Sequence, residues 1–167
     1  GVVTLNINEN VAEDLSINLN TAATQVSSTF NGTRPSVQIQ NVPANSSAPF
    51  TATFAFSEPV IDFIPTDITV TNATVSTFII VSTSSYTALI TPTANGAVTL
   101  DVNANVAQDI AGNLNTAATQ VTSQYDASRP SVAIQNVPEN TKAAFIATFA
   151  FDKIVTDFII SDISVSN

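Results

Sequence analysis

The chain of 167 residues carries 4 basic and 13 acidic residues, a formal net charge of −9, and contains no histidine or cysteine. These absences exclude imidazole bases, thiol nucleophiles, disulfides and zinc–thiolate sites, and four positive charges are too few for a nucleic-acid interface. Apolar residues still make up 44% of the chain, enough for a packed core, yet the longest apolar runs are far too short to span a membrane.

Alternating apolar and polar residues predict a series of short strands. In residues 50–56, Phe54 and Phe56 alternate with Thr53, as expected for half-buried antiparallel strands. We expect strands, in chain order, at residues 36–40, 50–56, 60–63, 67–72, 77–82, 85–92, 97–103 and 117–125. Residues 105–110 are the one helix-like stretch and are too short for more than one turn.

This strand spacing predicts an all-β fold, an antiparallel sandwich of two sheets. The parity of each strand assigns the core; its expected members are Phe54, Phe56, Ile68, Val70, Ile90, Val98 and Leu100. The opposite parity places Thr53, Thr99 and Asp101 outside the core.

The sequence repeats itself with a period of 95 residues. Arg34-Pro-Ser-Val returns at Arg129, and Asn20-Thr-Ala-Ala-Thr-Gln-Val returns at Asn115. Residues 1–72 align with residues 96–167 without a gap, and 44 of the 72 pairs, about 61%, are identical. We therefore expect the C-terminal part of one repeat at 1–33, a complete repeat at 34–128 and the N-terminal part of the next at 129–167, as a segment of a longer array.

An ordered series of motifs resembles a known family. The motifs are Phe56-Ser-Glu-Pro-Val, Thr66-Asp-Ile-Thr-Val, Tyr86-Thr-Ala-Leu-Ile-Thr-Pro-Thr, Gly96-Ala-Val-Thr-Leu, Ala107-Gln-Asp-Ile-Ala-Gly-Asn113 and Asn115-Thr-Ala. The series resembles the bacterial immunoglobulin-like (Big) repeats of large surface adhesins and extracellular fibres. The resemblance implies tandem immunoglobulin-like antiparallel β-sandwiches, located outside the cell or on its surface and often stiffened by calcium.

The resemblance also implies calcium ligands in the loops and linkers. The candidates are Glu58, Asp67, Asp109, Asn113 and Asp126. Calcium takes six to eight oxygen ligands, which carboxylates and amide carbonyls can supply. Two positions change between copies, since Glu58 corresponds to Lys153 and Asp126 corresponds to Asn31. The alternative interpretation is that the candidates are turn and cap residues.

The linker between repeats is short and contains a proline. Residues 126–130 connect the last strand of one repeat to the first strand of the next, so we expect neighbouring repeats to hold a defined angle. Arg34 and Arg129 precede the prolines. Each arginine is expected either to pair with a carboxylate of the neighbouring repeat, which we favour, or to be solvated.

The sequence favours a structural role. The near-identical repeats predict a stalk or filament of a bacterial-type surface adhesin or fibre, with neighbouring repeats, and identical chains in a fibre, as partners. The alternative is an adhesive module that recognises a glycan or a host protein through loops at one end of the sandwich, with an unidentified surface ligand. We predict no enzyme, because residues 34–128 contain neither histidine nor lysine to activate a serine.

Overall fold

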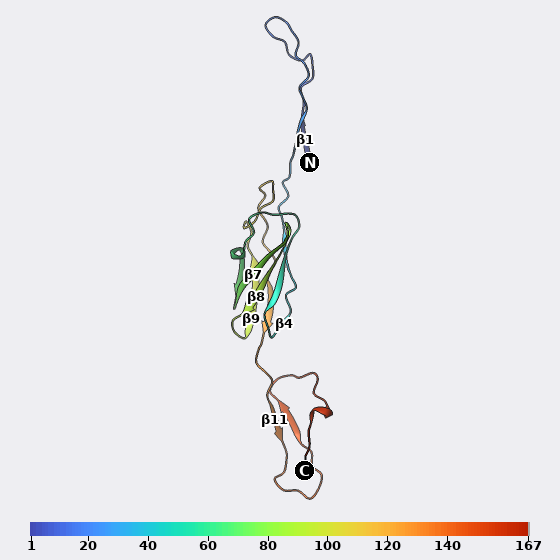
Figure 1. Cartoon of the computed structure of the whole chain (residues 1–167), viewed down its shortest axis with the longest axis vertical. Coiled ribbons are helices and arrows are strands. Elements are labelled where there is room, and N and C mark those ends of the chain that lie inside the picture. The colour runs from blue at the N-terminus through green and yellow to red at the C-terminus, as the bar shows by residue number, and fades with distance from the viewer. Residues whose placement is uncertain (167) are drawn as a thin grey trace. The chain divides into compact units, whose positions relative to one another are not determined.

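The computed structural model describes residues 1–166, and strands form most of its regular structure (Figure 1). The chain divides into two compact units, one spanning Gly1–Asp126 and the other beginning at Ala127. The helical elements among the described residues are two single turns of 3₁₀ helix, η1 (Pro65–Asp67) and η2 (Ile160–Asp162).

The first unit contains a sandwich of two four-stranded sheets (Figure 1). One sheet has, in spatial order, β3 (Val37–Gln40), β5 (Phe50–Phe56), β8 (Ser85–Pro92) and β7 (Ala73–Ser82). The other has β4 (Asn45–Ser46), β10 (Val121–Tyr125), β9 (Gly96–Val102) and β6 (Ile68–Thr71). Neighbouring strands are antiparallel except β4 and β10, which pair in parallel over two residues. The predicted all-β sandwich of antiparallel sheets is confirmed.

The predicted core is confirmed in all but one position. Six of its members are buried, namely Phe54, Phe56, Ile68, Ile90, Val98 and Leu100, while Val70 is only partly buried. Burial of each large apolar side chain contributes about 1.5–3 kcal/mol to stability. Thr53, Thr99 and Asp101 are half-buried, as the strand parity predicts.

A cluster of three aromatic rings, from Phe56, Phe63 and Tyr86, packs in the core beside the loop that follows β5. The ring of Phe63 lies 5.0 Å from that of Phe56 and 5.1 Å from that of Tyr86, both in edge-to-face geometry. The Tyr86 hydroxyl donates to the carbonyl oxygen of Val60 at 3.1 Å, which satisfies its polar atom inside the core.

Several predicted elements differ in the structure. Residues 60–63 form a loop rather than a strand, because Asp62 takes a left-handed conformation with φ 68°, which ends the extended run. The helix-like stretch 105–110 lies between turns at residues 104–105 and 110–111 and forms no helix; Asn105 is also left-handed, with φ 67°. Strand β7 starts four residues earlier than expected and β10 four residues later, while β4 and η1 were not predicted.

Two hairpins reproduce the strand pairing of the sandwich in the flanking copies. β1 (Val2–Leu5) pairs with β2 (Val26–Thr29) in the register that β9 and β10 adopt 95 residues later. β11 (Val132–Gln135) pairs with β12 (Thr148–Phe151) in the register of β3 and β5. The strand register therefore repeats with the same 95-residue period as the sequence.

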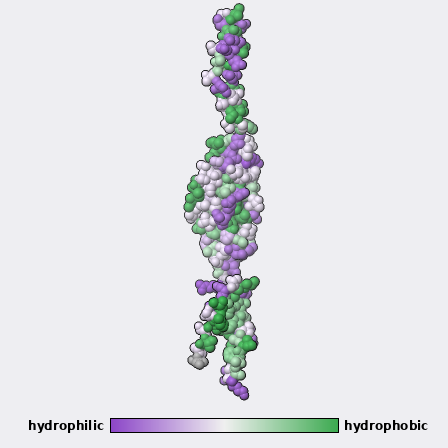
Figure 2. All heavy atoms as spheres, turned by 90° about the vertical axis from the view of Figure 1, so that its right-hand side faces the viewer, coloured by the Kyte–Doolittle hydropathy of each residue, from purple (hydrophilic) through white to green (hydrophobic). Residues whose placement is uncertain are grey.

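The hairpins expose side chains that the sandwich buries. Leu5 in β1 is 62% exposed, whereas its equivalent Leu100 in β9 is fully buried. For the C-terminal unit, Figure 2 shows a similar contrast: hydrophobic atoms gather over this unit, whereas the visible face of the sandwich is a mosaic of polar and apolar atoms. The hairpins lack the opposite sheet that covers the apolar faces of the sandwich strands.

Candidate functional site

Three segments meet at the end of the sandwich where the chain enters β3. They are the linker 31–35, the loop 57–64 that follows β5, and the loop 103–116 that follows β9. Main-chain hydrogen bonds join the two loops, since the amide of Ile61 donates to the carbonyl oxygen of Gln108 at 2.8 Å. We call this region the linker end of the sandwich.

Asp109 organises the longer loop. Its Oδ1 accepts hydrogen bonds from the amides of Ala111 (2.9 Å) and Asn113 (2.8 Å), and its Oδ2 accepts one from Asn113 Nδ2 (2.9 Å). The side-chain hydrogen bond from Asn113 is the main cause that holds the pKa of Asp109 below its usual value, although burial opposes it. Gly112 supplies the left-handed turn, with φ 87°.

The linker binds this loop through Asn31. Asn31 Nδ2 lies 2.8 Å from Asp109 Oδ2 and 3.4 Å from Glu58 Oε2. In return, Asn113 Nδ2 donates to the main-chain carbonyl oxygen of Asn31 at 2.9 Å. Asn31, Glu58, Asp109 and Asn113 are called the junction cluster below.

Arg34 anchors the same linker to the same loop. Its Nε donates to the carbonyl oxygen of Leu114 at 2.7 Å, and its Nη2 donates to that of Asn115 at 2.8 Å and to Asn105 Oδ1 at 2.6 Å. All three acceptors are uncharged and lie in the loop 103–116 of the same sandwich. The prediction that Arg34 pairs with a carboxylate of a neighbouring repeat is therefore wrong, whereas the same prediction for Arg129 stays a prediction.

The structure brings together three of the five predicted calcium ligands. Glu58, Asp109 and Asn113 lie in the junction cluster. Asp67 lies apart and caps η1, where its Oδ2 accepts the amide of Ile64 at 2.9 Å. Asp126 lies at the opposite end of the sandwich, after β10, and accepts a hydrogen bond from the side chain of Asn95. Across residues 1–166 there is no group of three or more acidic side chains close enough to hold a metal ion.

The junction cluster in this arrangement does not fit a calcium ion. Calcium binds oxygen lone pairs, and both carboxylate oxygens of Asp109 already accept N–H groups. The amide nitrogens of Asn31 and Asn113, which cannot be ligands, point at Asp109 Oδ2. We therefore derive no calcium-dependent step from this cluster, and calcium binding by the chain stays a prediction.

Asn115 is a structural residue that the sequence interpretation missed. The side chain is fully buried; its Oδ1 accepts the amides of Val106 and Ala107, and its Nδ2 donates to the carbonyl oxygens of Asn103 and Thr116, all at 2.8–2.9 Å. The internal repeat could have indicated the importance of this residue, because the same seven-residue run begins at Asn115 and at Asn20.

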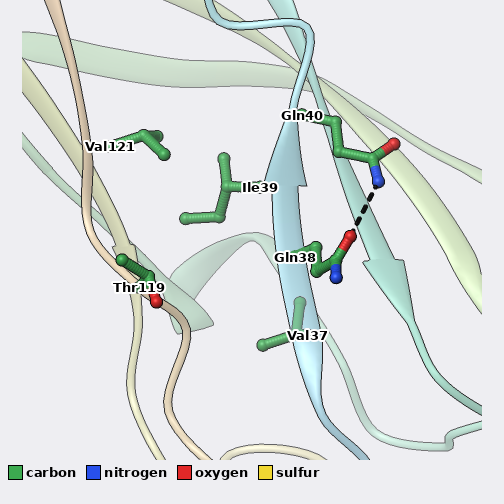
Figure 3. A pocket seen from close by; sticks show the side chains of 6 residues that line it. All are labelled: Val37, Gln38, Ile39, Gln40, Thr119 and Val121. Atoms are coloured by element: carbon green, nitrogen blue, oxygen red, sulfur yellow. Dashed lines mark hydrogen bonds between the residues drawn. The ribbon is translucent and has the colours of Figure 1, made fainter.

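A groove on the side of the sandwich offers little for recognition or catalysis (Figure 3). The groove, with a volume of about 220 Å³, lies between β3 and the segment leading into β10. Its walls are Val37, Ile39, Thr119 and Val121 on one side of β3, with Gln38 and Gln40 on the other, and none of them is charged. Such a surface lacks the convergent polar groups of a ligand site.

A comparison with protein families identifies the domain. The family model described as bacterial Ig-like domain matches residues 31–125, from Asn31 of the junction cluster to the end of β10. The chain belongs to this family. Bacterial Ig-like domains are usually extracellular or surface-exposed and are typically non-catalytic. No curated protein matches the chain significantly, and none of the helical turns within residues 1–166 is long and apolar enough to cross a membrane.

Proposed function

We propose that this bacterial Ig-like domain is a structural spacer in a stalk or filament of an extracellular surface adhesin or fibre. In such a filament, successive 95-residue repeats keep a distance between a cell surface and whatever the filament presents. The observation that carries the proposal is the docking of the linker 31–35 onto the sandwich that follows it.

The linker is bound to the sandwich at three of its five residues, Asn31, Arg34 and Pro35. Asn31 and Arg34 bind the loop 103–116 through their side chains, and Pro35 is buried, with its carbonyl oxygen accepting the amide of Thr116 at 2.8 Å. One residue further, the amide of Ser36 donates to Ser57 Oγ at 3.0 Å. A linker tied at successive positions, with a proline among them, has little freedom to bend.

The repeats themselves support a tandem array. The pairing of β1 with β2 and of β11 with β12 keeps the register found in the complete sandwich. In an array of this kind each repeat stabilises only its neighbours, so stability and length both grow repeat by repeat. No catalytic role is part of the proposal, because the chain contains no histidine or cysteine and no reactive cluster is needed for spacing.

Small-angle scattering of tandem arrays tests the proposal. The arrays contain two, three or four copies of residues 31–125. Each copy then includes its own Asn31, Glu58 and Asp109, so the docked linker is retained between neighbouring copies. The maximum dimension of the particle should increase by a constant amount with each added copy. A matched array with a glycine–serine insertion in each linker should give shorter and more variable particles. Compact particles from the unmodified arrays, with copies folded back on each other, would contradict the proposal.

A further inference from the structure

The junction cluster places one amide group against two carboxylates. Asn31 Nδ2 lies between Glu58 Oε2 and Asp109 Oδ2, at 3.4 and 2.8 Å. Asp109 is buried, and Asn31 and Glu58 are half-buried, so water screens the repulsion between the two carboxylates only in part. A donor at this point relieves the repulsion, as a bridging cation would.

The hydrogen-bond network fixes the orientation of the Asn31 amide. Asn31 Oδ1 accepts the main-chain amide of Thr33 at 3.0 Å, so its Nδ2 must face the carboxylates. With the side chain turned over, an NH₂ group would face the N–H of Thr33, and an oxygen would face Asp109. The linker therefore presents a donor, and the loops present the acceptors.

The two positions that meet here differ together in the next copy. The residues 95 positions after Asn31 and Glu58 are Asp126 and Lys153. In the first combination the linker position is the donor and the loop position is the acceptor. In the second combination a carboxylate stands at the linker position and an ammonium group at the loop position. In each combination one of the two positions carries the donor and the other carries the acceptor. Changing only one of the two positions would place two acceptors or two donors against each other.

We propose that positions 31 and 58 form a matched pair in which the Asn31 amide takes the place of a bridging cation. The residue at position 31 then decides whether the linker end depends on a divalent cation. With asparagine, the linker binds the sandwich without a metal ion. With a carboxylate at position 31 and glutamate retained at position 58, three acidic groups meet, and a cation is needed to hold them. With a lysine at position 58, its ammonium group replaces that cation. This inference concerns the chemistry of the linker end and does not depend on the stalk function.

Substitutions in the complete 167-residue chain test the pair. The variants are Asn31→Asp, Glu58→Lys and the double variant Asn31→Asp/Glu58→Lys, and Asn45→Asp is the control that adds the same charge on β4. Both tyrosines, Tyr86 and Tyr125, lie in the sandwich, so tyrosine fluorescence reports its thermal unfolding. Each variant is measured with millimolar calcium and with a chelator, and calcium binding is measured by titration calorimetry.

We expect the wild-type chain and the Asn45→Asp control to unfold at the same temperature with and without calcium. Asn31→Asp should lower the Tm by about 5 °C in chelator, recover it in calcium and bind calcium in the titration. The double variant should recover most of the lost Tm in chelator and lose the calcium response. A calcium response of the wild-type chain, an Asn31→Asp variant indifferent to calcium, or a double variant as unstable as Asn31→Asp would each overturn the proposal.

Discussion

Replacing Asn115 by alanine should destabilise the sandwich more than any other polar substitution in the loop 103–116. The substitution removes four hydrogen bonds and leaves the amides of Val106 and Ala107 and the carbonyl oxygens of Asn103 and Thr116 without their partner. Because Ala107 is 1% exposed, water cannot reach its amide without a rearrangement of the loop.

The expected change in the free energy of unfolding follows from the number and the burial of these four main-chain groups. A hydrogen bond contributes about 1 kcal/mol net, and a buried group left unsatisfied costs about 1–3 kcal/mol. Asn103 and Val106 are at least partly accessible, so water compensates part of the loss there. We therefore expect Asn115→Ala to lower the free energy of unfolding by about 3–5 kcal/mol, which for a domain of this size lowers the Tm by more than about 12 °C.

The chain provides a matched control at Asn20. Asn20 makes the same four hydrogen bonds, to the amides of Val11 and Ala12 and the carbonyl oxygens of Asn8 and Thr21, but these groups are exposed to water. Urea unfolding followed by tyrosine fluorescence should show a large effect for Asn115→Ala and less than about 0.5 kcal/mol for Asn20→Ala. A loss below about 1 kcal/mol for Asn115→Ala, or equal losses for the two variants, would show that the buried hydrogen bonds of Asn115 do not stabilise the loop.

Two further predictions, one substitution and one pH titration, concern the interior of the sandwich. The Ser123 hydroxyl is the only buried side-chain polar atom without a hydrogen-bond partner among residues 1–166, so Ser123→Ala should leave urea stability unchanged or raise it by up to about 1 kcal/mol; a clear loss would show that the hydroxyl is satisfied. Burial raises the pKa of Tyr86 above 10.0, so its contribution to stability is complete below pH 10 and is lost as the pH rises through the higher pKa of the folded state. In a Tyr125→Phe background the absorbance titration of Tyr86 should therefore lie above pH 10 in the folded protein and shift down in urea; equal titrations would contradict the assignment.

The strands of the sandwich were predictable because strand parity is a local property. β5 and β8 have the predicted bounds, since each alternates without interruption between turn residues. Residues 60–63 have the same apolar character, but the left-handed conformation of Asp62 turns Val60 and Phe63 into loop residues that still fill the core. Composition alone does not distinguish a strand from a loop with two buried side chains.

The linker end was predictable in its residues but not in its chemistry. The sequence predicts Asp109 and Asn113 as carboxylate and amide ligands, and the structure places them together in one loop. Asn31 and Asn115 were missed, because an amide is donor or acceptor according to the groups that the fold brings to it. The partners of Asn31 lie 27 and 78 residues away in the sequence, too far for any local pattern to reveal them.

A distance measured across the linker tests whether its docking onto the sandwich fixes the angle between neighbouring copies. The chain contains no cysteine, so Thr122→Cys in each copy of a two-copy chain of residues 31–125 places one spin label on the exposed side of each β10. If the linker is docked, the labels should give a single narrow distance distribution, which should broaden when Arg34→Ala is introduced at the junction. A broad distribution in the unmodified chain, equal to that of a chain with a glycine–serine insertion in the linker, would contradict this prediction.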